Sequence, residues 1–370
     1  MKEKERLESL DILRGADMFL LLFIGPVVRA LCKVHPDGTA WLGRQVQHVP
    51  WEGFVTWDII MPLFLFLSGI TIPFSMARYK QGGLRPDGKF YLKLLRRFFL
   101  LFFLGWIVQG NLLLFEWNQF HPFANTLQAI AVGYVVAALL FVHTDWKWQV
   151  GVCLLLFAAY WIAFASTGMN TDPQGNVAMT VDKAVLGSHR DGVAWADDGS
   201  WRFMKRYQYT WVLSSFNFAV TVLLGCFAGQ ILRREKHSPA RRAGILAGIG
   251  ILLVAAGLSL SPVFPIIKKI WSSTMTLYSG GICFLLTALF YYIIDVKRWR
   301  RGLSWLKIYG MNAITAYCIG EFVKFDSVSG SFLAGFVDAA WYPVLVALAN
   351  ALILLLILRQ MYKNKVFLKV

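Results

Sequence analysis

The stretch IIMPLFLFLSGITI, residues 59–72, decides the fold class. It is apolar throughout rather than alternating, and runs of similar character recur along the chain. About 20 apolar residues in a helix cross the roughly 30 Å of hydrocarbon in a bilayer. Inside hydrocarbon each backbone N–H and C=O must be paired within its own segment, which favours helices. We therefore predict an all-α, polytopic integral membrane bundle.

The composition agrees with a membrane protein. Of the 370 residues, 57% are hydrophobic and 16% are charged, whereas soluble domains carry about 25% charged residues. The net charge of +16 would suit a nucleic-acid partner, but the Lys and Arg residues lie in short loops between apolar runs. That distribution sets membrane orientation, so we expect the lipid bilayer as a partner and no nucleic acid.

The apolar runs divide the chain into about ten transmembrane helices, and residues 324–340 are left as a re-entrant or interfacial piece. Most of the 37 Lys and Arg residues fall on the side of loops 1–9, 77–92, 143–147, 233–241, 295–302 and the tail after 361. The positive-inside rule places this side, and both termini, in the cytoplasm of a bacterial-type inner membrane. No cleavable signal peptide is expected, because no small-residue cleavage site follows the first apolar run. The expected spans are 10–31, 53–76, 93–115, 124–142, 148–166, 209–232, 242–261, 270–294, 303–323 and 340–361.

We expect residues 1–370 to form a single transmembrane domain with two long outer loops, 32–52 and 167–208. The second loop is rich in Gly, Asp and aromatic residues, which suits contact with a sugar, although a solvated connector explains the composition equally well. The five cysteines form no CxxC pair. We therefore predict neither a disulfide nor a metal site.

Ionisable residues inside spans cost about 2.5–3.5 kcal/mol or more near the bilayer centre, so each is a candidate functional residue. Asp11 and Arg14 are three residues apart at the cytoplasmic end of the first span, where they can pair on one helix face. The pair is either a structural ion pair or an anchor for an anionic ligand that enters from the cytoplasm.

A second candidate group lies at the outer end of the second span. Pro50 suits the first turn of a helix, which would put His48 at its outer mouth and Asp58 about 12 Å further in, at 1.5 Å per residue. A lone His in a loop is usually a surface residue, but a His above a buried carboxylate suits acid–base or acyl-accepting chemistry. Glu321 falls on the same outer side, in the ninth span.

Two blocks of sequence resemble the heparan-α-glucosaminide N-acetyltransferase family. Residues 6–15, RLESLDILRG, match its R-x-x-S-x-D-x-x-R-G start, and residues 48–69 match H-x-x-W-x-G-x-x-x-x-D-x-x-x-P-x-F-x-F-x-x-G. Weaker matches, which extend the resemblance in order over nearly the whole chain, are Leu127-Gln128, Leu224-Gly225 to Gly229, Lys268-Lys269-Ile270-Trp271-Ser272 and Tyr309-Gly310-Met311-Asn312-Ala313-Ile314.

The resemblance implies an acetyl-CoA-dependent N-acetyltransferase that passes the acetyl group of cytosolic acetyl-CoA to the amine of a glucosamine-type sugar on the outer side. His48 corresponds to the family's active-site His and Asp58 to its buried Asp. The sequence departs from the family at Ala129, Gly25-Pro26 and Gly320. The implied contacts to acetyl-CoA are Asp11, Arg14, Gln128, Lys268 and Asn312, and those to the sugar are Trp51, Glu52 and Glu321.

Two other functions remain open at this point. A transporter of amino sugars or N-acetylglucosamine, without chemistry, would also place charged residues in its spans. An acyltransferase that modifies a different envelope polysaccharide would share the chemistry and differ only in its acceptor. Assembly into a homodimer is left open as well.

Overall fold

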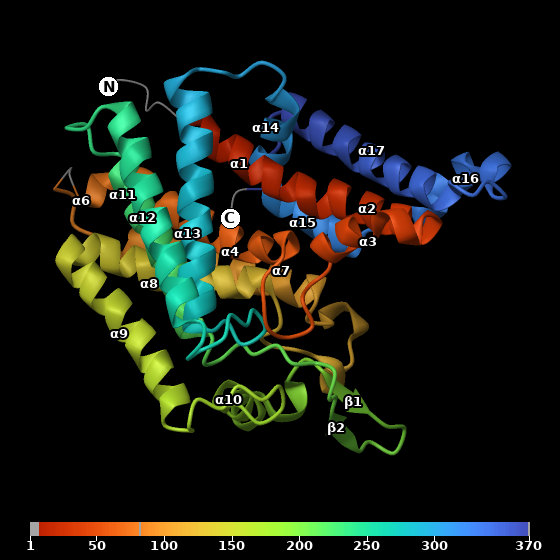
Figure 1. Ribbon diagram of the computed structural model, residues 1–370, viewed down its shortest axis with the longest axis horizontal. Helices are drawn as coiled ribbons and strands as arrows, with labels where there is room; N and C mark the ends of the chain where they lie inside the picture. The colour runs from red at the N-terminus through yellow and green to blue at the C-terminus, as the bar shows by residue number, and fades with distance from the viewer. Residues whose placement is uncertain (1–6, 81–82, 369–370) are drawn as a thin grey trace. The chain divides into compact units, whose positions relative to one another are not determined.

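The computed structural model describes residues 7–80 and 83–368, and nearly all regular structure within them is helical (Figure 1). Eight helices of the described chain are long and apolar enough to cross a membrane. The prediction of an all-α polytopic membrane protein is confirmed. The eight are Glu8–Val34, Thr56–Ser75, Thr126–His143, Trp146–Ala165, Ser215–Leu232, Pro239–Leu260, Ser273–Val296 and Tyr342–Lys363.

The helical and strand boundaries follow in chain order. The helices are α1 (Glu8–Phe19), α2 (Gly25–Val34), α3 (Pro36–Gln45), α4 (Ile60–Ile70), α5 (Ile72–Ser75), α6 (Ala77–Lys80), α7 (Gly88–Val108), α8 (Thr126–His143), α9 (Trp146–Ala165), α10 (Val177–Leu186), α11 (Ser215–Leu232), α12 (Pro239–Leu260), α13 (Ser273–Phe290), α14 (Ser304–Met311), α15 (Ala313–Phe322), α16 (Asp326–Phe332) and α17 (Tyr342–Lys363). The strands β1 (Val193–Trp195) and β2 (Trp201–Phe203) pair antiparallel.

Two of the ten expected spans do not appear as single long apolar helices. The expected span 93–115 is α7, which begins earlier, carries four Lys and Arg residues and ends at Val108. Asn111 and Phe115 beyond it have left-handed backbone conformations, with φ of 57° and 55°, which a continuing helix excludes. The expected span 303–323 is broken at Asn312 into α14 and α15.

The chain forms two compact units, and each is described here by itself. The first unit comprises the described parts of 1–50, 54–63 and 286–369; the second comprises 51–53 and 64–285. The expectation of one continuous domain stays a prediction.

In the first unit, α1 and α2 form one span through the π-helical turn Leu20–Ile24. Pro26 has no N–H to donate to the carbonyl group one turn earlier, and the helix widens just before it. Backbone packing fixes α1 against α14, because a Cβ on Gly15 would overlap the carbonyl oxygen of Leu306 and a Cβ on Gly310 that of Asp11. Small residues between membrane helices allow the two backbones to approach this closely.

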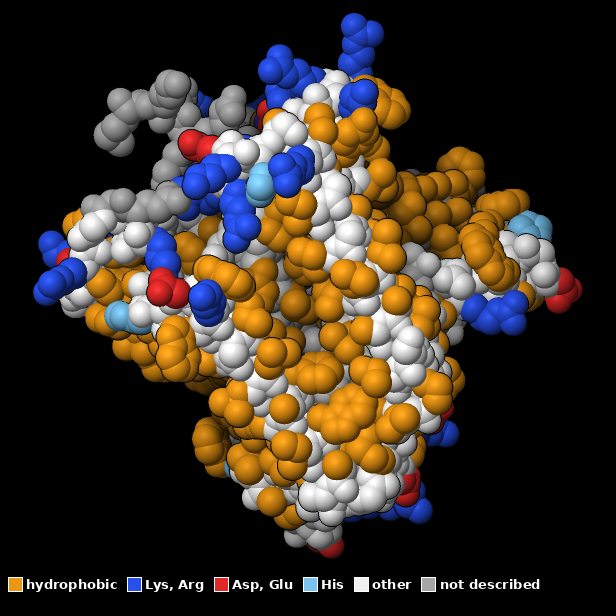
Figure 2. Space-filling model, turned by 60° about the vertical axis from the view of Figure 1, so that its left-hand side comes forward, with side chains coloured by type: hydrophobic (Ala, Val, Ile, Leu, Met, Phe, Trp, Pro, Cys, Tyr) orange, Lys and Arg blue, Asp and Glu red, His pale blue; other side chains and the backbone are white. Residues whose placement is uncertain are grey.

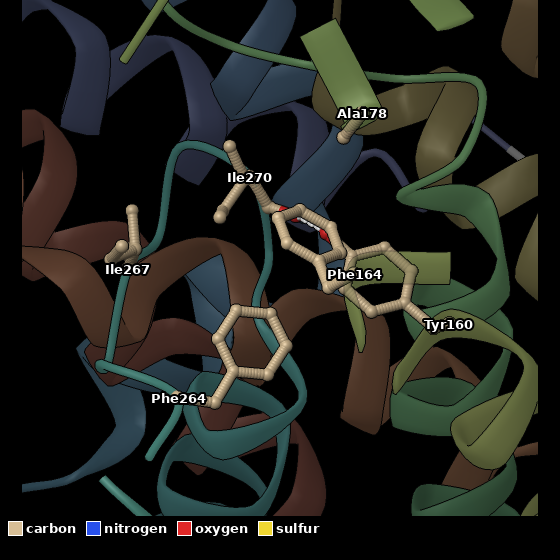
Figure 3. Packing of buried hydrophobic residues seen from close by; sticks show 6 residues of the cluster. All are labelled: Tyr160, Phe164, Ala178, Phe264, Ile267 and Ile270. Atoms are coloured by element: carbon tan, nitrogen blue, oxygen red, sulfur yellow. Dashed lines mark hydrogen bonds between the residues drawn. The ribbon is translucent and has the colours of Figure 1, made fainter. Parts of the chain in front are cut away.

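The second unit uses the same device between α4 and α11. A Cβ on Gly69 would overlap the carbonyl oxygen of Val222, and a Cβ on Gly225 that of Phe66. Its aromatic core surrounds Tyr160, which is fully buried and donates its hydroxyl to the Ile270 carbonyl (Figure 3). The hydrogen bond satisfies the one polar atom that this ring brings into the core.

Apolar side chains also cover the outside of the long helices. Figure 2 shows hydrophobic side chains over most of one face, with many of the Lys and Arg side chains in its upper part and others at its right and lower right. Leu155 on α9 and Leu252 on α12 are 65% and 71% exposed. A soluble protein rarely leaves contiguous apolar surface of this kind, whereas lipid tails solvate it at no cost.

Candidate active site

The side chains of His48 and Asp58 are in direct contact within the first unit. His48 Nδ1 lies 2.7 Å from Asp58 Oδ1, and Asp58 is fully buried while the His48 side chain is 38% exposed. An ionised carboxylate only accepts hydrogen bonds, so Nδ1 is the protonated nitrogen and Nε2 carries the lone pair. In this tautomer Nε2 is the basic nitrogen of the imidazole.

The local chain fold brings these two residues together. Residues 46–55 are not helical, and a short 3₁₀ turn, Thr56–Ile59, leads into α4. The expected helical start at Pro50 and the 12 Å axial separation between His48 and Asp58 are therefore wrong. The other carboxylate oxygen, Asp58 Oδ2, accepts the Val55 N–H at 3.2 Å, which holds the carboxylate at the start of the helix.

Arg29 on α2 contacts residues next to His48 and Asp58 in the chain. It was not among the candidates predicted from the sequence. Its Nη1 donates to the Val46 carbonyl at 3.2 Å, two residues before His48. Its guanidinium lies 4.9 Å from the centre of the Trp57 ring, beside Asp58 in the chain. A cation near the outer end of an otherwise apolar helix is the signal that would have identified it.

Glu321 lies exposed near the end of α15 in the same unit, and Arg29 is the charge that acts on it. The role of Glu321 as a sugar contact stays a prediction.

The predicted pair of Asp11 and Arg14 forms on α1. Asp11 Oδ1 lies 3.5 Å from Arg14 Nη1, and the Asp11 side chain is 6% exposed. Arg6 of the same sequence block lies outside the described residues. Arg29 follows Arg14 by fifteen positions on the span Glu8–Val34, which is about 22 Å at 1.5 Å per residue.

Asn312 stands at the break between α14 and α15. It is 2% exposed, and its Nδ2 donates to the Ile308 carbonyl at 3.3 Å. Within the described chain its Oδ1 has no hydrogen-bond partner. A buried amide oxygen without a donor is costly, so a ligand N–H or O–H would complete this site.

Trp51 and Glu52, the predicted sugar contacts, belong to the second unit. Trp51 Nε1 donates to the Thr171 carbonyl at 3.1 Å. Glu52 forms an isolated antiparallel bridge with Ile267, and the Gly53 N–H donates to the Ile266 carbonyl at 2.9 Å. These bonds fix the three residues that follow the His48 loop and place Glu52 next to the strand-like segment that carries Lys268.

Lys268 and Gln128, two predicted contacts to acetyl-CoA, are both buried in the second unit. Lys268 is 6% exposed. The Gln128 amide accepts the Ala124 N–H at 2.7 Å and donates to the Pro122 carbonyl at 3.0 Å. Both ends of Gln128 therefore stabilise the turn before α8, which favours a structural role for this residue.

The long loop after α9 folds around buried charges. Both Asp182 oxygens accept backbone N–H groups, from Trp211 at 2.8 Å and Val212 at 2.9 Å. Burial raises the pKa of Asp182 to about 6, against the lowering effect of these N–H groups and of Arg190. Burial also raises the pKa of Asp191, which accepts from Trp211 Nε1. This loop is an ordered structure, not a solvated connector.

The described residues contain no group of three or more His, Cys, Asp or Glu side chains arranged to hold a metal ion. The fold and the site thus define a polytopic membrane protein with a buried carboxylate that orients an accessible imidazole.

Comparison with known proteins gives the family-level relationship. No family model matches the chain. It is 24% identical over 361 residues to heparan-alpha-glucosaminide N-acetyltransferase of Mus musculus, covering 84% of this chain and 53% of the relative. The Homo sapiens enzyme of that name is 24% identical over 362 residues, covering 84% and 52%. The matches support the relationship expected from the sequence, and the chain spans about half the length of the curated relatives it matches.

Proposed function

We propose that this protein is a membrane-bound N-acetyltransferase that moves an acetyl group from cytosolic acetyl-CoA to the amine of a glucosamine-type sugar on the outer side of a bacterial-type inner membrane. The observation that carries the proposal is the 2.7 Å contact between His48 Nδ1 and Asp58 Oδ1, which favours the tautomer with the lone pair on Nε2. The relatives, whose name states N-acetyl transfer to a glucosaminide, support the same class of reaction.

His48 acts in one of two ways. As a general base, Nε2 takes a proton from the sugar ammonium, and the free amine attacks the thioester carbonyl. The C–S bond then breaks, and the second proton of the attacking nitrogen passes to the CoA thiolate. As an acyl carrier, Nε2 itself attacks the thioester, the thiolate leaves, and the amine then attacks the acetyl-imidazole and returns Nε2 to its free state. Both routes need the tautomer that a hydrogen bond to Asp58 favours.

Arg14, held by Asp11 at 3.5 Å, would meet the phosphate groups of CoA from the cytoplasmic side. A guanidinium matches phosphate geometry with two parallel N–H donors. The distance of about 22 Å along the helix from Arg14 to Arg29 then calls for a donor that binds extended, with its phosphates at one end and its thioester at the other. The buried Asn312 and Lys268 are the further contacts we propose for acetyl-CoA.

Glu321 of the first unit, and Trp51 and Glu52 of the second unit, are the contacts we propose for the sugar. A carboxylate attracts the ammonium group of glucosamine, and a ring packs against the apolar face of a pyranose. Arg29 would attract the Glu321 carboxylate without taking part in the acetyl transfer itself.

The test is the product formed by detergent-solubilised protein given acetyl-CoA and glucosamine, measured by mass spectrometry. The proposal predicts N-acetylglucosamine and free CoA in equal amounts. A transporter without chemistry would give no acetylated sugar in detergent, and instead would move labelled sugar into proteoliposomes that lack acetyl-CoA. An envelope-modifying acyltransferase would release CoA only when a polysaccharide acceptor replaces glucosamine.

A further inference from the structure

The second unit contains a cleft that the proposed acetyl transfer does not use. Its volume is about 690 Å³, within the range typical of small-molecule sites. The lining carries four cationic side chains against one carboxylate, that of Glu235. The cations are Lys80, Arg233, Arg234 and Lys236, and the lining also includes His237 and the apolar Pro73 and Phe141.

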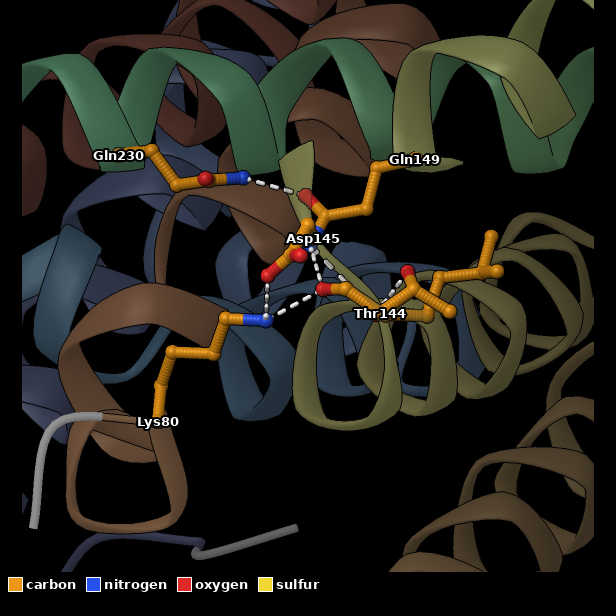
Figure 4. Close-up of polar contacts among 6 residues, drawn as sticks. Lys80, Thr144, Asp145, Gln149 and Gln230 are labelled. Atoms are coloured by element: carbon orange, nitrogen blue, oxygen red, sulfur yellow. Dashed lines mark hydrogen bonds and ion pairs between the residues drawn. The ribbon is translucent and has the colours of Figure 1, made fainter. Parts of the chain in front are cut away.

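One wall of the cleft is a fixed polar network (Figure 4). Lys80 Nζ donates to the Thr144 carbonyl and lies 3.9 Å from Asp145 Oδ1. The buried Gln149 donates to the same carbonyl at 2.9 Å and accepts from Gln230 Nε2 at 2.7 Å. Because each partner is held by another, this side of the cleft is ordered before any ligand arrives.

The opposite wall comes from the end of α11 and the turn that follows it. Arg233 donates to the Pro73 carbonyl and its guanidinium lies 5.9 Å from the centre of the Phe74 ring. Arg234 and Lys236 follow in the chain, and their side chains are exposed. Two long, exposed cations therefore belong to a lining that also contains the apolar Pro73 and Phe141.

The positive-inside rule explains why Lys and Arg lie in these loops, but it does not require them to surround a cleft. Three features together indicate a ligand: the volume of the cleft, the excess of cations over carboxylates in its lining, and a lining that is partly held by hydrogen bonds and partly apolar. Arg and Lys side chains form strong charge-assisted hydrogen bonds with phosphate oxygens. The apolar wall provides contact area for the carbon part of an ester.

We propose that this cleft binds a phosphate ester, with Arg234 and Lys236 contacting the phosphate and Phe141 and Pro73 contacting the organic group. The chemistry fits two sources, the headgroup of an anionic phospholipid or a soluble phosphate ester from the cytoplasm. The inference does not depend on acetyl transfer, because none of these residues belongs to the proposed active site.

The test compares three full-length proteins purified in detergent: the wild type, an Arg234→Gln/Lys236→Gln variant, and a Lys147→Gln/Arg241→Gln control. The control removes the same charge from exposed positions outside the cleft. Equal melting temperatures for the three would show that the folds are intact before binding is measured.

In the soluble arm, binding of adenosine 5′-monophosphate is titrated against adenosine at constant ionic strength. In the lipid arm, native mass spectrometry counts phosphatidylglycerol retained from nanodiscs of equimolar phosphatidylcholine and phosphatidylglycerol. We expect saturable binding in at least one arm, equal for wild type and control and at least about tenfold weaker for the cleft variant, which corresponds to about 1.4 kcal/mol. The arm in which saturable binding is seen identifies whether the phosphate ester is a soluble compound or a phospholipid headgroup.

Absence of saturable binding in both arms would overturn the proposal. A cleft variant that binds as tightly as the wild type would also overturn it, because Arg234 and Lys236 would then not contact the ligand. A control variant that loses binding to the same extent would overturn it as well, because that result assigns the effect to general surface charge.

Discussion

His48 Nδ1 and Asp58 Oδ1 are 2.7 Å apart, and this contact joins an accessible loop to a fully buried position at the start of a membrane helix. The carboxylate is in turn held by the Val55 N–H. A chain of two hydrogen bonds thus determines which imidazole nitrogen carries the proton. Any chemistry at His48 depends on that choice.

Asp58→Asn tests the orientation of the imidazole. The amide keeps the shape of the carboxylate but no longer enforces protonation at Nδ1. We expect kcat for acetyl transfer to fall by about 10²–10⁴-fold, with KM for glucosamine changed far less. Steady-state kinetics with an unchanged melting temperature would check this; a variant with wild-type kcat would show that Asp58 does not set the tautomer.

Arg29→Met tests the contribution of the Arg29 guanidinium to the structure around His48. The variant keeps a long apolar stem over Trp57 but removes the donor to the Val46 carbonyl and the charge beside Glu321. We expect a loss of about 1 kcal/mol in the free energy of unfolding and a KM for glucosamine raised about tenfold, which is about 1.4 kcal/mol of binding. Arg29→Lys should recover part of the KM effect, and no recovery would argue against an electrostatic role.

Gly310→Ala tests the contact between α1 and α14. The added Cβ would overlap the Asp11 carbonyl oxygen, so the helices must separate, at a cost of about 1–3 kcal/mol. Gly38→Ala in α3 is the control, because a Cβ there meets nothing within 4 Å. Melting temperatures in detergent measure both; equal stability of Gly310→Ala and wild type would contradict the close packing.

The raised pKa of Asp182 predicts that the stability of its loop depends on pH. Its folded pKa of about 6 lies above the ordinary value of 3.8, so the ionised form costs free energy at neutral pH and protonation relieves that cost. Stability should therefore rise as the pH falls below 6, by about 1.4 kcal/mol at pH 5.

The matched variant for this effect is Asp182→Asn, which cannot titrate. The remaining ionisable groups near Asp182, namely Arg190, Asp191 and Tyr160, stay in place. Protection of the Trp211 and Val212 amides against hydrogen exchange, compared at pH 7.5 and pH 5, reports the loop directly. Equal pH dependence in the variant and the wild type would assign the effect to Asp191 or another group.

Hydropathy predicted the helical spans well because a bilayer leaves few alternatives to a helix. It failed where local backbone preference overrides composition. The residues after Val108 are apolar, and Asn111 still turns the chain there. Asn312 likewise divides an apolar stretch into α14 and α15, and periodicity does not reveal such a break.

The candidate site was only partly visible in the sequence. The pairing of Asp11 with Arg14 followed from helix spacing, since both residues lie on one continuous helix. The distance between His48 and Asp58 did not follow, because it depends on the irregular path of residues 46–55. Arg29 was missed for a related reason: its partners Val46 and Trp57 come from that same loop and from the turn beyond it.

The most direct test of the central claim compares acetyl transfer by wild type, His48→Gln and the imidazole control His35→Gln, with each protein purified in the same detergent. His48→Gln keeps a polar side chain but has no basic nitrogen, whereas His35 lies beside Trp341 at a ring distance of 4.9 Å and outside the proposed chemistry. We predict that His48→Gln loses at least about 10²-fold in the rate of N-acetylglucosamine formation while His35→Gln keeps the wild-type rate. Equal rates for His48→Gln and wild type would contradict the account.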